Sequence, residues 1–290
     1  MHRPSAFTLL ALVAGPLACW TPIQQRGLPP LGTPADSAAA AQAAAQAAAA
    51  APVSAPAGAP STASAAAPSS PTAQQLAAWE RERNDWPNFA RYRQANAQLG
   101  APAPGENRVV FMGNSITDAW AKRFAQDFPG KPYIGRGISG QTTPQMLVRF
   151  RQDVVELKPK VVVILAGIND IAGNTGPSTQ EMIANNIMGM TEIAKANGIR
   201  VVLSSVLPAY DFPWRRGMEP APKVVALNAW IKAYAQGAGV VYLDYYSKMA
   251  DARGGLSPEL ASDGVHPTAA GYQLMAPLAE AAIAEALARR

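Results

Sequence analysis

The residues of this chain that could carry acid–base chemistry are few, and the most informative of them is a histidine. The sequence holds two histidines, and His2 lies in an N-terminal segment typical of an export signal. If the mature protein uses an imidazole, that imidazole therefore belongs to His266. It follows the turn signal Asp263-Gly264, and Pro267 biases it toward an extended backbone. The carboxylate of Asp263 could fold back onto the ring and fix its tautomer, although a carboxylate in an Asp-Gly turn is also a common structural feature.

Ser115 follows a short apolar run and begins the motif Ser-Ile-Thr-Asp. This motif fits a capping box, with Ser115 as the N-cap of a helix and Asp118 at the third helical position. The hydroxyl could also be a nucleophile, because the N–H groups and the dipole at a helix N-terminus favour developing negative charge. From these residues alone the cap is the favoured role, and the nucleophile stays open because the two roles do not conflict.

A glycine-rich stretch offers a competing interpretation. Residues 135–140, Gly-Arg-Gly-Ile-Ser-Gly, match the G-x-G-x-x-G pattern of dinucleotide-binding loops. They follow a second strand rather than the first, and no acidic residue ends a strand about 20 residues later, as a ribose contact requires. A nicotinamide cofactor is therefore disfavoured. We expect these glycines to form a loop that presents backbone N–H groups to an anion. Asn169, after a later strand, is either a turn residue or an amide donor to an oxyanion.

Motifs for several other chemistries are missing from the sequence. It contains no G-x-S-x-G elbow, no P-loop, no H-E-x-x-H and no cysteine pair. A single histidine in the mature protein, without a carboxylate cluster beside it, disfavours metal catalysis. We therefore predict neither a metal nor a cofactor. The net charge of +5 is scattered along the chain, which favours a solvated surface over nucleic-acid binding.

Strands and helices that alternate along the chain must position these residues. Apolar runs of strand length alternate with segments of helical spacing, which predicts a parallel sheet of about five strands in a three-layer α/β/α sandwich. Ligands of such sheets gather beyond the carboxyl ends of the strands, where the motifs above lie. The predicted strands are 109–112, 133–134, 161–166, 201–206 and 240–243. The predicted helices are 119–128, 144–156, 180–197, 223–236 and 269–288, the last capped by Thr268.

The N-terminal quarter differs in composition from the rest. Residues 1–18 combine a positive charge with an apolar run, and we interpret them as a signal peptide. Cys19, the only cysteine, follows directly and is a candidate lipidation site, with plain secretion as the alternative. Residues 19–73 are a low-complexity linker rich in Ala and Pro, which has little apolar surface to bury. Residues 74–290 are then one domain.

Together, the motifs resemble the sequence blocks of the SGNH hydrolases, also called the GDSL esterase/lipase family, over about residues 107–288. Asn114 and Ile116 depart from the pattern, since they stand where the family usually has Asp and Leu. Among relatives, the chain is most similar to bacterial esterases for short acyl groups, including those acting on sugars, and to the platelet-activating-factor acetylhydrolase branch. The matching blocks are Gly113-Asn114-Ser115-Ile116, the glycine Gly140, Gly167-Ile168-Asn169-Asp170 and Asp263-Gly264-Val265-His266-Pro267.

The resemblance implies a serine esterase that needs no cofactor. In that family pattern Ser115 is the nucleophile, His266 is the base and Asp263 orients it. The oxyanion hole consists of the N–H groups of Ser115 and Gly140 and the amide of Asn169.

The substrate is predicted from the segment 208–223, which should overhang this site. Tyr210, Trp214 and Arg215 could form an aromatic platform for a sugar ring and a contact to an acidic or hydroxylated group, unless the segment is only a packed loop with solvated arginines.

We therefore expect an exported enzyme that hydrolyses short-chain esters, acetyl above all, on a small-molecule or polysaccharide carrier. It would be periplasmic, tethered to the outer membrane through Cys19, or secreted. Two other possibilities stay open: a lysophospholipase, thioesterase or arylesterase with the same triad, and a non-catalytic carbohydrate-binding module.

Overall fold

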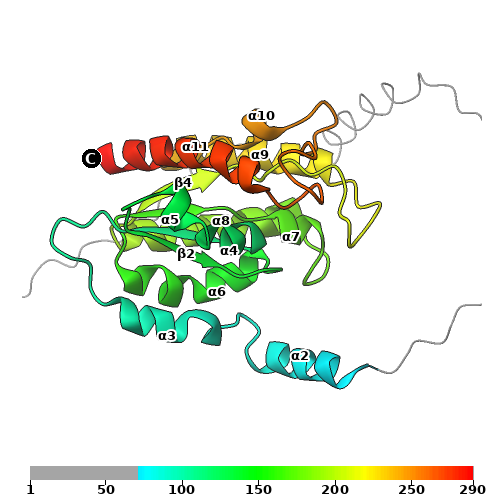
Figure 1. The fold of residues 1–290 in the computed structure, drawn as a ribbon, viewed down its shortest axis with the longest axis horizontal. Coiled ribbons are helices and arrows are strands. Elements are labelled where there is room, and N and C mark those ends of the chain that lie inside the picture. Colours follow the sequence, from blue (N-terminus) through cyan, green and yellow to red (C-terminus); the bar gives the residue numbers. More distant parts are fainter. Residues whose placement is uncertain (1–70, 290) are drawn as a thin grey trace, which may run out of the picture.

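A parallel sheet forms the centre of the molecule (Figure 1), and it has five strands. The computed structural model describes residues 71–289. The strands pair in the order β2-β1-β3-β4-β5, which confirms the predicted parallel sheet. Chain-consecutive strands alternate with helices, as crossovers between parallel strands require. The strands are Val109–Gly113 (β1), Tyr133–Gly137 (β2), Val161–Ile164 (β3), Arg200–Ser204 (β4) and Val241–Leu243 (β5).

Helices cover both faces of this sheet, which gives the predicted three layers. Figure 1 shows α11 on one side of the sheet and α6 on the other, with α3 beyond α6. The helices that pack on the sheet are Ser115–Ala121 (α4), Phe124–Asp127 (α5), Thr143–Asp153 (α6), Gln180–Ala196 (α8), Pro220–Ala238 (α9) and Ala269–Ala288 (α11). The remaining ones are Ala73–Asn84 (α2), Ala90–Leu99 (α3), the 3₁₀ turn Val155–Leu157 (η1), Ile168–Ile171 (α7) and Tyr246–Met249 (α10).

Each central strand is buried on both faces, because side chains alternate along a strand. In β1, Val110 and Met112 join a core formed with α6, α8 and α9. Val109 and Phe111 join a second core, formed with α4, α5 and α11. This two-sided burial explains why the strands are nearly continuous runs of Val, Ile and Leu rather than alternating ones.

Two predictions about helix ends have different outcomes. Thr268 caps α11 as predicted, since its hydroxyl accepts the N–H of Gly271 at 3.3 Å. The predicted single helix over 119–128 is wrong, because the structure breaks it into α4 and α5. Trp120 and Asp127 would lie about 10 Å apart along a continuous helix. The break lets the indole N–H of Trp120 donate to Asp127 at 3.0 Å.

The predictions for the N-terminal quarter fall outside the described residues. They are the signal peptide at 1–18, the lipidation of Cys19 and all but the last residues of the linker at 19–73. The described chain continues with α2 and α3, two helices that the sequence analysis did not predict. Between residues 71 and 289, no helix is both long enough and apolar enough to cross a membrane.

Candidate active site

Ser115 lies at the carboxyl end of β1, where the chain turns directly into α4. The close turn needs Gly113, because a Cβ there would lie 2.1 Å from the hydroxyl of Thr117. The prediction that Ser115 caps the helix is wrong: the N-cap is Asn114, and its side chain makes no capping hydrogen bond. Asp118, the other half of the expected capping box, pairs with Arg91 at 3.3 Å instead. The Ser115 hydroxyl is therefore not used as a cap.

His266 reaches this hydroxyl from a loop 151 positions later in the chain. Its Nε2 lies 2.9 Å from Ser115 Oγ. Its Nδ1 lies 2.6 Å from Oδ2 of Asp263, whose carboxylate folds back onto the ring as the sequence analysis expected. Gly264 makes the turn possible, with φ at +79°. The three side chains form a continuous chain of hydrogen bonds from a carboxylate through an imidazole to a hydroxyl.

The loop also fixes the charge on Asp263. Burial raises the pKa of this carboxyl, but the hydrogen bonds from the backbone and ring of His266 and from the Val265 N–H outweigh burial and lower its pKa below the ordinary value. The carboxylate is therefore ionised near neutral pH. An ionised partner favours the Nδ1–H tautomer of His266, which leaves Nε2 free to accept the proton of Ser115.

The glycine-rich stretch 135–140 has two structural roles. Gly135 and Gly137 lie within β2, not in a loop, and α4 packs directly on them. A Cβ on Gly137 would lie 2.2 Å from the backbone nitrogen of Asp118. These two glycines serve strand–helix packing, so the expectation that they present N–H groups to an anion is wrong for them. Gly140 does lie in the loop after β2, with φ at +80° and open space around it, so backbone conformation is what requires glycine there.

The loops after β1, β2 and β3 are tied together at one edge of the sheet. Ile138 N–H donates to Gly113 O at 3.2 Å, which joins the second loop to the first. Asn169, buried at the start of α7, donates its amide to Gln141 O at 2.9 Å, which joins the third loop to the second. A side-chain amide has two N–H donors, so one remains for another acceptor. The loops that carry Gly140 and Asn169 are thus linked to each other and to the end of β1, which precedes Ser115.

Comparison with known proteins identifies the family of this chain. Residues 96–274 match the model of the GDSL-like lipase/acylhydrolase family. The chain belongs to this family. The matched stretch begins within α3 and ends within α11, so it includes the whole sheet and all three loops described above.

Several members of known structure or sequence are similar to this chain. A GDSL-like lipase from Bacteroides thetaiotaomicron is 48% identical, with a TM-score of 0.67 over 69% of this chain and 99% of its own. Esterase TesA from Pseudomonas aeruginosa is 25% identical over 57% of this chain and 78% of its own. The lipoprotein YqeF from Bacillus subtilis is 32% identical over 27% of this chain, which spans only 33% of that relative.

A solved acetyl-xylooligosaccharide esterase from Geobacillus is similar in fold alone. It is 21% identical, with a TM-score of 0.50 over 63% of this chain and 96% of its own. The family and its members therefore support a general esterase or acylhydrolase activity.

One departure from the family pattern is now visible in the structure. Asn114, where the family usually has Asp, is 1% exposed, and neither its side-chain oxygen nor its nitrogen has a hydrogen-bond partner in the described structure. Without a hydrogen-bond partner, a buried carboxylate is more costly than a buried amide.

The predicted substrate residues do not all lie together. The Trp214 ring lies over the site, with its centroid 6.0 Å from that of His266, and it stacks on Phe212 at 5.2 Å. Arg215 is exposed, as the alternative interpretation held, and its Nη1 donates to the carbonyls of Ala172 and Gly173 at 2.5 and 2.9 Å. Tyr210 lies apart from both and packs under the Arg253 guanidinium at 5.1 Å.

A buried arginine supports the site and was not identified from the sequence. Arg149 in α6 is fully buried and pairs with Asp153 at 2.9 Å. It also donates to the side chain of Gln141 at 2.6 Å and to the carbonyls of Gly113 and Arg136, both at 2.9 Å. One guanidinium thus joins the ends of β1 and β2 to the loop that carries Gly140. The available signal was a charged pair spaced i, i+4 on the apolar face of a predicted helix.

Asp170, next to Asn169, holds the start of α6. Its carboxylate accepts the Thr143 N–H at 3.0 and 3.1 Å and the Thr143 hydroxyl at 2.5 Å. Burial raises the pKa of Asp170 to about 6, against these hydrogen bonds, which lower it. Within residues 71–289, no three His, Cys, Asp or Glu side chains gather as a metal site.

The raised pKa of Asp170 predicts a measurable effect of pH on the stability of the fold. The folded state binds the proton of the Asp170 carboxyl more tightly than the unfolded state, in which the pKa is 3.8. The protonated carboxyl therefore contributes stability that is present below about pH 4 and is lost as pH rises through about 6. The loss is at most about 3 kcal/mol. We expect the free energy of unfolding of the wild type, relative to Asp170→Asn, to fall by about 2 kcal/mol from pH 4 to pH 7. Urea unfolding at both pH values measures it, and parallel pH dependences would contradict the shift.

Proposed function

We propose that this protein is an exported serine esterase that removes short acyl groups, acetyl above all, from carbohydrate. The observation that supports the chemistry best is the hydrogen-bonded series Asp263, His266 and Ser115, with contacts of 2.6 and 2.9 Å. Nucleophile, base and orienting carboxylate are each within hydrogen-bonding reach of the next, which is the geometry that acyl transfer through a serine requires.

In the proposed first half-reaction, His266 Nε2 accepts the proton of Ser115 Oγ as that oxygen attacks the ester carbonyl carbon. The carbonyl oxygen becomes an oxyanion, held by the N–H groups of Ser115 and Gly140 and by the remaining amide donor of Asn169. Losing one such donor typically costs about 10²–10³ in turnover. His266 then gives its proton to the departing alcohol oxygen, which leaves an acyl-serine.

In the second half-reaction, water replaces the alcohol. His266 accepts a proton from the water as its oxygen attacks the acyl carbon. The tetrahedral intermediate collapses, Ser115 takes the proton back and the carboxylic acid leaves. Asp263 stays ionised throughout, because the hydrogen bonds from the His266 loop lower its pKa. It stabilises the imidazolium without accepting its proton.

Three observations support a short acyl group on a sugar. The indole of Trp214 beside His266 offers a flat apolar face at the place where the alcohol part of an ester would lie. The surface beyond it is lined by amide and hydroxyl side chains, which suit a hydroxylated ligand better than a long hydrocarbon chain. The Geobacillus relative in fold acts on acetylated xylooligosaccharides. Export rests on the signal-like residues 1–18 and on Cys19.

A series of p-nitrophenyl esters with increasing acyl chain length tests the acyl preference. We expect kcat/KM to be highest for acetate and to fall steadily toward about eight carbons, because the polar surroundings give a long chain little apolar surface to cover. Release of acetate from acetylated xylan by the same preparation tests the carrier. A preference for about eight carbons or more would favour a lysophospholipase or thioesterase. Binding of xylan with no hydrolysis of any ester would favour a carbohydrate-binding module.

A further inference from the structure

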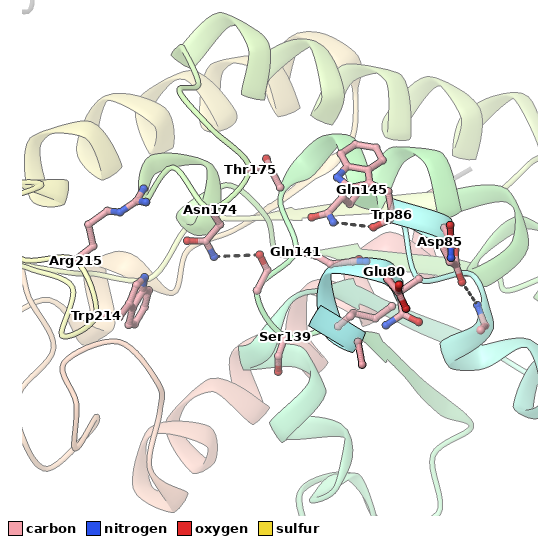
Figure 2. A pocket seen from close by; sticks show the side chains of 16 residues that line it. Glu80, Asp85, Trp86, Ser139, Gln141, Gln145, Asn174, Thr175, Trp214 and Arg215 are labelled. Carbon is pink, nitrogen blue, oxygen red and sulfur yellow. Dashed lines mark hydrogen bonds between the residues drawn. The ribbon is translucent and has the colours of Figure 1, made fainter. Parts of the chain in front are cut away.

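A cavity of about 940 Å³ opens beside the catalytic residues. Trp214, whose ring faces His266, lines one end of it together with Gly140. Trp86 and Glu80 line the other end, as Figure 2 shows. The volume is at the upper end of the range of about 300–1,000 Å³ that is usual for ligand pockets. The cavity is therefore larger than an acetyl group needs, and it leads away from the site of acyl transfer.

The far wall of this cavity comes from a part of the chain that the family model does not match. Helix α2 and the segment 85–89 that follows it precede residue 96, where the match begins. The Asn84 and Asp85 side chains line the cavity next to Trp86. Family membership thus assigns no role to this wall.

The segment 85–89 of this wall is held by α6 and by the loop that carries Gly140. Asn88 N–H closes a turn onto Asp85 O at 2.8 Å, and the Asp85 carboxylate accepts the N–H groups of Phe89 and Ala90 at 2.8 and 2.9 Å. Three glutamine side chains hold its carbonyls: Gln145 donates to Trp86 O (2.9 Å), Gln141 to Pro87 O (2.7 Å) and Gln152 to Phe89 O (2.9 Å). Figure 2 shows Gln145 bonded to Trp86 at the edge of the cavity.

These contacts fix Trp86 relative to the oxyanion loop. Gln141 is the residue after Gly140, and its own side chain is anchored by Arg149 at 2.6 Å. The Trp86 backbone therefore has little freedom, while its indole remains 38% exposed. A partly exposed indole whose backbone is held at a fixed place beside a reaction centre is a typical anchor for a ligand.

The lining selects one class of ligand. Besides the two indoles, amides and hydroxyls line the cavity, among them Asn84, Asn174 and Thr175, which suit sugar hydroxyls. Apart from the indoles, the apolar side chains of the lining are those of Ala77, Ala90 and Ile138, so a hydrocarbon chain would meet mostly polar residues. An anionic ligand would meet the carboxylates of Glu80 and Asp85, while Arg215 already donates to backbone carbonyls. Indole faces combined with polar side chains and no excess of positive charge fit a neutral glycan.

We propose that the cavity between Trp214 and Trp86 is a subsite for the neutral sugar units that flank the acylated one, with Trp86 as the platform of its far end. The inference rests on the proposed carbohydrate esterase activity and deepens it, since the enzyme should then prefer an acylated oligosaccharide to an acylated monosaccharide. The subsite acts on binding and leaves the chemical step unchanged.

Trp86→Ala in the full chain tests the subsite. Substrates are acetylated tetrasaccharides and monosaccharides of xylose, mannose and glucose, with p-nitrophenyl acetate as the small ester. For the wild type we expect at least one tetrasaccharide to have a KM about tenfold or more below that of its monosaccharide. The variant should lose this advantage through KM, with kcat unchanged, because one stacked anchor is removed. Its rates on the monosaccharide and on p-nitrophenyl acetate should stay at the wild-type level.

Trp79→Ala is the matched control. Trp79 lies on α2, is 57% exposed and is not among the residues that line the cavity. We expect this variant to behave as the wild type on every substrate. Equal KM changes in the two tryptophan variants, or a wild type that does not distinguish tetrasaccharide from monosaccharide, would overturn the subsite. A Trp86→Ala defect confined to p-nitrophenyl octanoate would assign the cavity to an acyl chain and would also overturn it.

Binding without hydrolysis separates this inference from the proposed function. Calorimetry with unacetylated xylo-, manno- and gluco-tetraose measures the subsite whether or not the protein hydrolyses an ester. Loss of binding in Trp86→Ala but not in Trp79→Ala supports the subsite even if no ester is hydrolysed. A wild type that hydrolyses p-nitrophenyl acetate but binds no tetrasaccharide would leave the esterase intact and remove the subsite.

Discussion

Replacing Ser115 by alanine lowers the turnover of p-nitrophenyl acetate about a thousandfold or more, because no other group can form the acyl-enzyme. The change removes a single oxygen, whose only described partner is His266 Nε2 at 2.9 Å. Since this hydroxyl does not cap α4, its loss should leave the helix in place. We therefore expect the free energy of unfolding to change by less than about 0.5–1 kcal/mol. Initial rates and urea unfolding measure the two effects separately.

Ser247→Ala is the control for this experiment, since Ser247 is exposed at the start of α10. It should retain wild-type activity. A fluorophosphonate probe adds an independent measurement: it should label one peptide, the one containing Ser115, in the wild type and in Ser247→Ala, and should label nothing in Ser115→Ala. If Ser115→Ala and the wild type hydrolyse the ester equally, the hydroxyl is not the nucleophile and the proposed function fails.

The sequence predicted most of the sheet, because its strands are runs of Val, Ile and Leu that only burial on both faces explains. It predicted β2 poorly. That strand extends to Gly137 through two glycines, which strand propensity disfavours, and it exists because α4 packs closely on them. The helices α2 and α3 were missed for a similar reason. They lack a clear apolar stripe, and tertiary contacts rather than periodicity hold the segment between them.

The motifs predicted which residues meet at the site, because each motif stands at the end of a strand or the start of a helix. The role of Ser115 as a cap was wrong, since the same four-residue pattern fits a capping box and a tight strand–helix turn. Local sequence does not distinguish them. The support behind the site could not be predicted at all. Gln141 and Trp86 have roles only because segments 54 or more positions apart meet in the fold.

Replacing Arg149 by methionine destabilises the protein by about 3–5 kcal/mol. Methionine fills a similar volume, but it leaves the buried carboxylate of Asp153 without its cation. It also removes the donors to the carbonyls of Gly113 and Arg136 and to the side chain of Gln141. Buried acceptors that lose their donors keep their desolvation cost, so the effect exceeds that of an exposed ion pair. Urea unfolding at neutral pH measures the loss.

Arg151→Met is the control, because Arg151 lies on the exposed side of the same helix. Its effect should stay within about 0.5 kcal/mol. Adding Asp153→Asn to Arg149→Met removes the uncompensated charge, so the double variant should recover part of the lost stability. Equal stabilities of Arg149→Met and Arg151→Met would contradict a structural role for the buried pair.

The same variant tests whether Arg149 positions the catalytic loop as well as stabilising the fold. The guanidinium holds Gln141, and Gln141 in turn accepts the amide of Asn169 at its carbonyl and holds the wall that carries Trp86. Loosening Gln141 should therefore lower kcat for p-nitrophenyl acetate under conditions where Arg149→Met is still fully folded, because oxyanion donors act only when held in place. A folded variant with wild-type kcat would show that the loop keeps its geometry without the arginine. Arg149 would then contribute to the stability of the fold but not to the positioning of the loop.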